Sequence, residues 1–344
     1  MIDFLKETAR ALVAEGKGIL AIDESNATCN ARFAKLGIPQ TDEMRRTYRE
    51  LLITAPGLLQ YISGAILYDE TIRQSDAKGQ PFVEIMTAYG ILPGIKVDTG
   101  TVTLSGTDGE KITEGLDGLR SRVDEYVKLG ARFAKWRAVF TIGRGLPSAK
   151  AIAANAHALA RYASICQAGG LVPIVEPELL MDGSHSIEQS ANATIGVLSR
   201  VFAELEEQDV ALDAIVLKPG MVISGESAPV AASVADVARH TLRVLTETVP
   251  KSVAGIAFLS GGQSNERATA HLDAMNRDAT FRKPWPITFS YGRALQQPAL
   301  EHWRGNADAI PAAQVLLVHR ARMNALAARG RYSVDLEVVD TAKA

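Results

Sequence analysis

The residue with the clearest chemical potential is Lys218, which follows the apolar run 214–217 and precedes Pro219-Gly220. An apolar run of this length between turn residues is typical of a buried strand, so the lysine at its end is carried into a low-dielectric site. Burial and a neighbouring cation both favour the neutral amine, and a neutral amine can attack a carbonyl carbon to form a Schiff base. Lys218 is therefore a candidate nucleophile, although a lone lysine in this position also fits the start of a surface loop.

The same arrangement, an apolar run followed by a polar residue, occurs eight times along the chain. The segments between the runs have the periodicity and end signals of amphipathic helices, for example 117–130 and 148–170. We therefore expect eight strands that alternate with helices. The runs and the polar residues that follow them are 18–22 with Asp23, 64–68 with Asp69, 92–95 with Lys96, 131–134 with Lys135, 171–175 with Glu176, 214–217 with Lys218, 255–259 with Ser260 and 287–289 with Ser290.

Eight parallel strands alternating with helices predict an α/β fold, a (β/α)₈ TIM barrel. The active site of such a barrel lies at the carboxyl ends of its strands, where the polar residues would converge. A doubly wound open sheet is the structural alternative. We expect a single domain over residues 1–344, with an amphipathic N-terminal helix, a barrel from about 17 to 303, and a C-terminal helix and mobile tail from about 304 to 344.

Composition favours an enzyme domain over a nucleic-acid-binding or membrane protein. The 344 residues include 37 Lys and Arg against 39 Asp and Glu, which leaves no basic surplus for a nucleic-acid partner. No apolar run approaches the roughly 18 residues that span a bilayer, so no membrane partner is expected. The two cysteines, Cys29 and Cys166, form no disulfide framework, and we expect free thiols in a cytoplasmic protein.

Glycine-rich segments after the last two runs predict a phosphate site. Ser260-Gly261-Gly262 follows the seventh run, and Ser290 begins a segment that continues through Gly292-Arg293 into a helix. Glycines let backbone N–H groups approach an anion, the helix N-terminus adds a positive dipole end, and an arginine binds phosphate oxygens in bidentate fashion. The loops after strands seven and eight are the usual phosphate site of TIM barrels, while two ordinary tight turns are the alternative.

A second anion site is predicted on the opposite side of the barrel mouth. Ser25, Thr28 and Arg32 follow the first run, and Lys96 follows the third. Ser25 also fits a simple helix cap. Two phosphate sites on either side of a Schiff-base lysine predict a sugar bisphosphate as the substrate.

Six segments of the chain resemble class I fructose-1,6-bisphosphate aldolase, in that family's order and from about residue 16 to residue 332. The resemblance implies a lyase that reversibly cleaves fructose 1,6-bisphosphate to dihydroxyacetone phosphate and glyceraldehyde 3-phosphate in glycolysis and gluconeogenesis. It also implies a lysine Schiff base, no metal or other cofactor, and a homotetramer. The segments are 16–25, 133–137, 173–178, 217–219, 258–264 and 290–295.

The resemblance also implies roles for individual residues. Lys218 matches the Schiff-base lysine, and Lys135 matches a second lysine whose charge would favour the neutral amine. Glu176 matches the carboxylate that moves protons during carbinolamine dehydration, Asp23 the acid that positions the lysines and the C4 hydroxyl, and Glu178 a supporting acid. The implied C1-phosphate residues are Ser260, Gly261, Gly292 and Arg293; the implied C6-phosphate residues are Ser25, Thr28 and Lys96; Arg32 and Arg137 would line the same cleft.

Three departures from the family pattern affect these expectations. Thr28 replaces a usual serine, and Gly220 replaces a common asparagine. The last tyrosine is Tyr332, whereas the animal enzymes end in a tyrosine that acts in proton transfer to the enamine. We therefore expect the barrel carboxylates, chiefly Glu176, to reprotonate C3.

Three other functions fit the sequence less well. A metal-dependent aldolase would need ligand-spaced histidines, and the six histidines lack such spacing and are expected on helices or the surface. A transaldolase-like enzyme would share the Schiff base but gives no reason for two phosphate sites. A non-enzymatic scaffold predicts loss of the strand-end groups, all of which are present.

Overall fold

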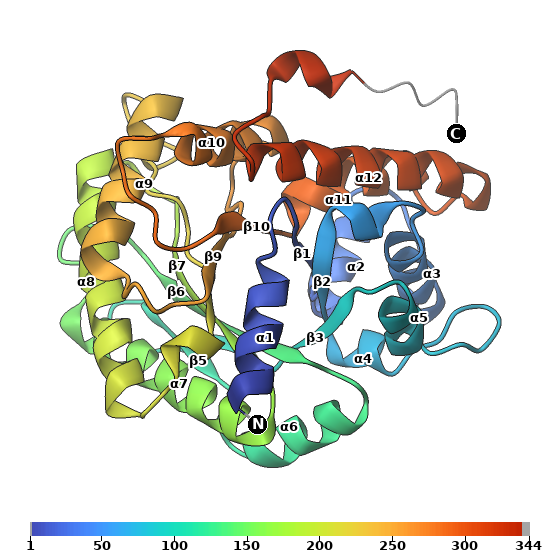
Figure 1. The fold of residues 1–344 in the computed structure, drawn as a ribbon, viewed down its shortest axis with the longest axis horizontal. Helices are drawn as coiled ribbons and strands as arrows, with labels where there is room; N and C mark the ends of the chain where they lie inside the picture. The colour runs from blue at the N-terminus through green and yellow to red at the C-terminus, as the bar shows by residue number, and fades with distance from the viewer. Residues whose placement is uncertain (1, 339–344) are drawn as a thin grey trace.

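Eight parallel strands close into a barrel with helices around it in the computed structural model, which describes residues 2–338 (Figure 1). β1 pairs with β2 on one side and with β10 on the other, so the sheet has no free edge. The predicted TIM barrel is confirmed, and the open-sheet alternative is wrong. In spatial order the strands are β1 (Gly18–Ala21), β10 (Ile287–Tyr291), β9 (Gly255–Phe258), β8 (Val216–Leu217), β7 (Val172–Leu179), β6 (Phe133–Phe140), β3 (Leu92–Lys96) and β2 (Ile62–Leu67).

The helices between the strands begin where the sequence supplies caps. The Ser148 side chain accepts a hydrogen bond at the start of α7, and Ser186 with Gln189 forms a capping box at α8. The α-helices are α1 (Ile2–Leu12), α2 (Asn26–Ala34), α3 (Asp42–Ile53), α4 (Asp69–Ile72), α5 (Phe82–Ala88), α6 (Leu119–Lys128), α7 (Ala149–Gly169), α8 (Ile187–Glu207), α9 (Val234–Thr248), α10 (Asn265–Arg277), α11 (Arg293–Trp303) and α12 (Ile310–Ala327). Short 3₁₀ helices are η1 (Leu58–Gln60), η2 (Leu212–Ala214), η3 (Ala307–Ala309) and η4 (Val334–Glu337).

Side-chain alternation along the strands separates two cores and aims the polar residues inward. On β6, Phe133 belongs to a small cluster that α1 covers, whereas Trp136 packs outward in the large core under the helices. Lys135 and Arg137 have the same parity as Phe133 and line the cavity at the barrel mouth. In Figure 1, α1 lies across the middle of the barrel, and its Leu5, Ala9 and Leu12 fill one end of the interior.

Two details differ from the sequence-based expectation. Lys135 and Glu176 lie within β6 and β7 rather than at strand ends, because the pairing continues through Arg137↔Glu176 and Val139↔Glu178. The strands continue through these charged residues because the alternate residues, such as Trp136 and Val175, stay apolar and pack in the core under the helices. The region before α6, for which the sequence predicted no strand, contains an antiparallel hairpin of β4 (Gly100–Thr103) and β5 (Lys111–Glu114), which pair only with each other in the described chain.

The start of the predicted tail is packed against the barrel. Glu337 on η4 forms an ion pair with the buried Arg320 and a hydrogen bond with His319 Nε2 at 3.1 Å, and it accepts a hydrogen bond from the Tyr332 hydroxyl at 2.9 Å. Residues 339–344 of the predicted mobile tail lie outside the described residues. Within residues 2–338, no helix has the length and apolarity needed to cross a membrane. Cys29 and Cys166 are buried free thiols, as expected.

Candidate active site

A cavity of about 1430 Å³ lies at the carboxyl ends of the strands. Every residue predicted from the sequence to form the site lines it except Gly262. Gly262 lines a smaller adjoining cavity, which it shares with Gly261 and Met181. The predicted residues on the main cavity are Asp23, Ser25, Thr28, Arg32, Lys96, Lys135, Arg137, Glu176, Glu178, Lys218, Ser260, Gly261, Ser290, Gly292 and Arg293.

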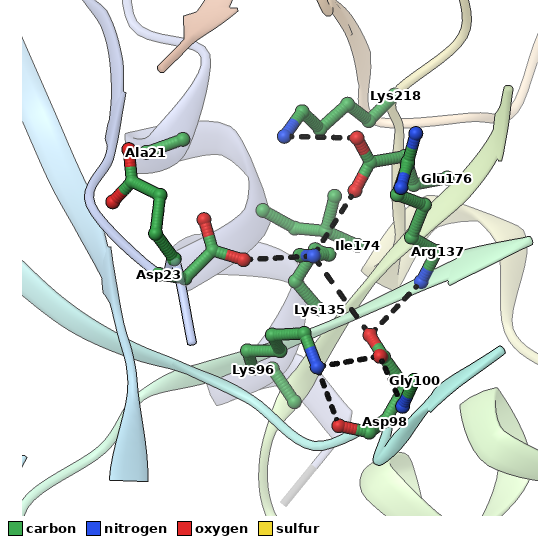
Figure 2. A network of polar contacts seen from close by, with 12 residues as sticks. Ala21, Asp23, Lys96, Asp98, Gly100, Lys135, Arg137, Ile174, Glu176 and Lys218 are labelled. Atoms are coloured by element: carbon green, nitrogen blue, oxygen red, sulfur yellow. Dashed lines mark hydrogen bonds and ion pairs between the residues drawn. The ribbon is translucent and has the colours of Figure 1, made fainter. Parts of the chain in front are cut away.

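Glu176 bridges the two central lysines, as Figure 2 shows. Its Oε1 lies 3.1 Å from Lys218 Nζ, and its Oε2 lies 3.5 Å from Lys135 Nζ. The side chains of all three residues are 4–5% exposed, so their charges meet in a site largely closed to solvent. Glu176 Oε2 is buried and accepts no hydrogen bond from the described residues. That oxygen is placed to accept a proton from a bound molecule.

Asp23 also contacts Lys135. It follows β1, and its Oδ2 lies 2.8 Å from Lys135 Nζ. Burial works against the charged carboxylate, but the Lys135 and Lys218 cations hold the pKa of Asp23 below its usual value of 3.8. Burial likewise opposes the Lys135 ammonium, and Asp23, Glu176 and Asp98 together raise its pKa well above 10.5. Both groups are therefore charged at neutral pH.

Asp98 is a site residue that the sequence reasoning missed. Its Oδ1 lies 2.6 Å from Lys96 Nζ, and its Oδ2 lies 3.8 Å from Lys135 Nζ. It also accepts a hydrogen bond from the Arg137 backbone N–H at 3.3 Å. The available signal was its position two residues beyond Lys96, at the end of the third strand. With Asp98 included, the centre holds three lysines and three carboxylates.

The residues predicted for the C6 phosphate form one wall of the cavity. Ser25 caps α2, accepting from the Thr28 N–H at 3.3 Å, and its hydroxyl lies 3.1 Å from that of Thr28. The cap and the cavity-lining position therefore coexist. Arg32 pairs with Glu24 at 2.6 Å, so its guanidinium already has an anionic partner. Lys96 is similarly paired with Asp98.

The residues predicted for the C1 phosphate form a second wall, on the loops after β9 and β10, and β10 is the neighbour of β1 in the barrel. Arg293, at the start of α11, donates to the backbone carbonyl groups of Gly261, at 3.3 Å, and of Gln263. Gly261 has a φ of +56°, in the left-handed region that favours glycine. The Ser290 hydroxyl is buried and has no hydrogen-bond partner among residues 2–338. Arg293 has no carboxylate partner within the described residues, so this wall is the more cationic one.

Arg137 and Glu178 form an ion pair between β6 and β7 at the cavity edge. Arg137 is 42% exposed, whereas Glu178 is largely buried. This pair can contact a ligand but lies beyond the bridged lysines. Over the described range, no group of three or more His, Cys, Asp or Glu residues is arranged to hold a metal ion.

Comparisons with known proteins agree on one family. Residues 4–344 match the family model named Glycolytic, described as fructose-bisphosphate aldolase class-I. The chain is 55% identical over 332 residues to the probable fructose-bisphosphate aldolase class 1 of Xanthomonas axonopodis pv. citri, covering 96% of this chain and 99% of that one. It is 50% identical over 323 residues to the cytosolic fructose-bisphosphate aldolase 4 of Arabidopsis thaliana, covering 94% and 82%. A crystal structure of fructose-bisphosphate aldolase from Plasmodium falciparum, in complex with TRAP and a small-molecule inhibitor, matches with a TM-score of 0.95 at 48% identity and 96% coverage of both chains.

Proposed function

The chain belongs to the class I fructose-bisphosphate aldolase family, and on that premise we propose that Lys218 is the amine that forms a Schiff base with the C2 ketone of the substrate. The chain is thus a lyase that acts on a sugar bisphosphate. The observation that carries the assignment of Lys218 is its position 3.1 Å from a buried carboxylate oxygen of Glu176, whose other oxygen faces a second lysine.

The proposed chemistry needs proton transfers that Glu176 is placed to make. The Lys218 amine adds to C2 to give a carbinolamine, and a proton delivered to the carbinolamine hydroxyl lets water leave as the protonated imine forms. When the C3–C4 bond breaks, the imine accepts the electron pair and becomes an enamine. Lys135, held as a cation by Asp23, stabilises negative charge near C2 during these steps.

Asp23 and Glu176 divide the remaining proton transfers in this proposal. The C4 hydroxyl must lose its proton as the aldehyde departs, and C3 must then gain one. We assign the proton of the C4 hydroxyl to the Asp23 carboxylate. Glu176, ionised once it has protonated the carbinolamine hydroxyl, takes up the next proton from solvent at its free Oε2 and delivers it to C3. In support of a barrel carboxylate at C3, the Tyr332 hydroxyl is bound to Glu337 and does not line the cavity.

The two cavity walls supply the phosphate contacts in this proposal. The wall with Arg293, which forms no ion pair within residues 2–338, takes the C1 phosphate, together with Ser260, Gly261 and Gly292. The wall with Ser25, Thr28 and Lys96 takes the C6 phosphate. Phosphates anchored at both ends fix the C2 and C3 atoms near the central lysines, so binding energy is converted into orientation.

Three further properties are part of the proposal. We propose one domain over residues 1–344, because a single large core draws on residues from Leu20 to Tyr332. We propose a homotetramer from the family resemblance, which sedimentation equilibrium would measure. A cytoplasmic location is proposed because one relative is named cytosolic.

Replacement of Lys218 tests the proposed function. Lys218→Met is expected to abolish cleavage of fructose 1,6-bisphosphate while the fold is retained, because methionine fills similar volume without an amine. The matched control is Lys251→Met, which changes an exposed lysine before β9, at the opposite end of the barrel. Retained cleavage in Lys218→Met, or equal loss in Lys251→Met, would refute the assignment.

A further inference from the structure

A buried imidazole lies behind the loop that follows β9. His271 projects from α10, is 1% exposed, and has its Nδ1 2.6 Å from Oε1 of Gln263. Gln263 is itself buried and belongs to the loop 260–263, whose Ser260 and Gly261 line the active-site cavity. The imidazole therefore contacts the loop from the side away from the substrate space.

The hydrogen-bond pattern determines which imidazole nitrogen carries the proton. Gln263 Nε2 lies 3.0 Å from the Ser260 carbonyl oxygen and must donate to it, so Gln263 Oε1 faces His271 and needs a donor. Burial, assisted by the Arg267 cation, lowers the pKa of His271 to about 4, so the ring is neutral at pH 7. The single proton then lies on Nδ1. His271 Nε2 is buried and has no hydrogen-bond partner in the described chain, so Gln263 is the ring's hydrogen-bonded contact.

The loop is held by donors on both of its sides. The Gln263 carboxamide binds the Ser260 carbonyl, and Arg293 donates to the carbonyl groups of Gly261 and Gln263. The Gln263 backbone N–H also closes a turn onto the Ser260 carbonyl at 3.3 Å. The Ser260 carbonyl is therefore held by the backbone N–H and the carboxamide of Gln263, and the orientation of the carboxamide depends on His271.

We propose that His271 is a positioning residue for the C1-phosphate loop, acting through Gln263 on Ser260 and Gly261. The proposal rests on the proposed function of that loop in binding the C1 phosphate. Without the Nδ1–H donor, Gln263 Oε1 is buried and unsatisfied, and the carboxamide turns away from Ser260. The loss of one buried hydrogen bond predicts roughly a tenfold weakening of phosphate binding.

A matched pair of substitutions tests this role. His271→Asn keeps an N–H donor in the place of Nδ1, whereas His271→Leu has nearly the same shape as asparagine and no donor. We expect His271→Leu to raise KM for fructose 1,6-bisphosphate and Kd for dihydroxyacetone phosphate roughly tenfold, with kcat little changed. His271→Asn is expected to restore both constants to within about twofold of the unmodified enzyme.

A substrate without phosphate separates positioning from general damage. The rate of borohydride inactivation in the presence of dihydroxyacetone reports Schiff-base formation without a phosphate contact. His271→Leu is expected to leave that rate unchanged. An equal loss with dihydroxyacetone and its phosphate, or no difference between the leucine and asparagine variants, overturns the proposal.

Two further variants cover the remaining outcomes. If His271→Leu does not fold, Gln263→Met removes the same carboxamide at similar length, and the same phosphate-selective loss is expected. When His271→Leu and Gln263→Met are combined, the two losses of affinity are expected not to add, because both substitutions break the same chain of hydrogen bonds to Ser260. If Arg293→Ala leaves dihydroxyacetone phosphate binding unchanged, the proposed assignment of this loop to the C1 phosphate fails. If Arg293→Ala weakens binding while His271→Leu and Gln263→Met do not, the positioning role alone fails.

Discussion

Three lysines and three carboxylates share the centre of this cavity, and four of the six, Lys135, Lys218, Asp98 and Glu176, are buried. Isolated buried charges are costly, and each group here is stabilised by a partner of opposite sign. Lys135 lies 2.8 Å from Asp23, and Lys96 lies 2.6 Å from Asp98. Lys218 has only Glu176 as an ion-pair partner among the described residues, at 3.1 Å. In the proposed mechanism, transfer of a proton from Lys218 to Glu176 frees the amine for attack.

Asp23 provides a test at the scale of one residue. Asp23→Asn is expected to lower kcat at least about 100-fold, because it removes both the contact that positions Lys135 and the proposed contact with the C4 hydroxyl. Since the pKa of Asp23 lies below 3.8, its carboxylate stays ionised as the pH falls from 7 to 5 and adds no acid limb to the wild-type profile there.

Initial rates of both proteins across pH 5–8 provide the measurement. Asp124→Asn, at an exposed acid on α6, is the control. A kcat of Asp23→Asn within about threefold of the unmodified enzyme would contradict the role.

The site residues that the sequence identified share one property. Lys218, Glu176 and Lys135 are polar residues within or next to apolar runs, which is a strong signal because charge at such positions is rarely tolerated without a purpose. Asp98 gave no such signal, since it stands in a polar segment after Val97. Its role depends on the folded path of the chain toward Lys96 and Lys135.

At the scale of elements, the sequence predicted the eight barrel strands but not the hairpin of β4 and β5. The barrel strands carry apolar residues on both faces, because one face packs against helices and the other fills the interior. The hairpin strands are short and largely exposed, with residues such as Thr101 and Lys111, and they pair only with each other in the described chain. Their pairing is a tertiary outcome that single-strand composition does not reveal.

The two walls of the cavity give a prediction at this scale, because each is built by the loops of different strands. Arg293→Ala, after β10, is expected to weaken binding of fructose 1,6-bisphosphate and fructose 1-phosphate alike. Lys96→Ala, at the end of β3, is expected to weaken binding of the bisphosphate more. Charge-assisted contacts of about 1.5 to 3 kcal/mol correspond to roughly tenfold to a hundredfold effects on KM.

Steady-state kinetics with both sugars measures the difference. Equal penalties on the two substrates from Lys96→Ala would remove it from the C6 side.

At the scale of the whole molecule, the segment after α12 is tied to the barrel by Glu337. Its partner Arg320 is 3% exposed and also donates to Thr269 Oγ1 on α10, so the contact links the tail, α12 and α10. The sequence predicted a mobile tail because helical periodicity ends near Gly330. It could not show that a single acid further along would meet a buried arginine.

Acid titration tests this attachment. Burial opposes ionisation of Glu337, but hydrogen bonds from His319 and Arg320 lower its pKa to about 2, against 4.5 for the unperturbed group. Because folding lowers its pKa, the ionised Glu337 carboxylate stabilises the folded protein above pH 4.5, and this stabilisation is lost as the pH falls toward 2. Glu337→Gln is expected to reduce stability at pH 7 by about 3 kcal/mol, because it leaves Arg320 buried without a carboxylate.

Thermal melts at pH 7, 5 and 3 measure both effects. The variant is expected to have a lower Tm at pH 7 and a flatter decline of Tm below pH 4.5. Superimposable melts of the two proteins at every pH would show that the ion pair does not hold the tail. The same ion pair limits how the tail can be shortened in a test of its part in proton transfer. A truncation after Val338 keeps Glu337, whereas one after Ser333 removes it.

The central claim is that Lys218 forms the Schiff base, and chemical trapping tests it most directly. The enzyme is treated with borohydride and dihydroxyacetone phosphate, digested, and mapped by mass spectrometry, with a sample lacking substrate as the control. The account predicts loss of activity together with one reduced adduct, on the peptide that contains Lys218. An adduct on Lys135 or Lys96 instead, or inactivation with no lysine adduct, would contradict it.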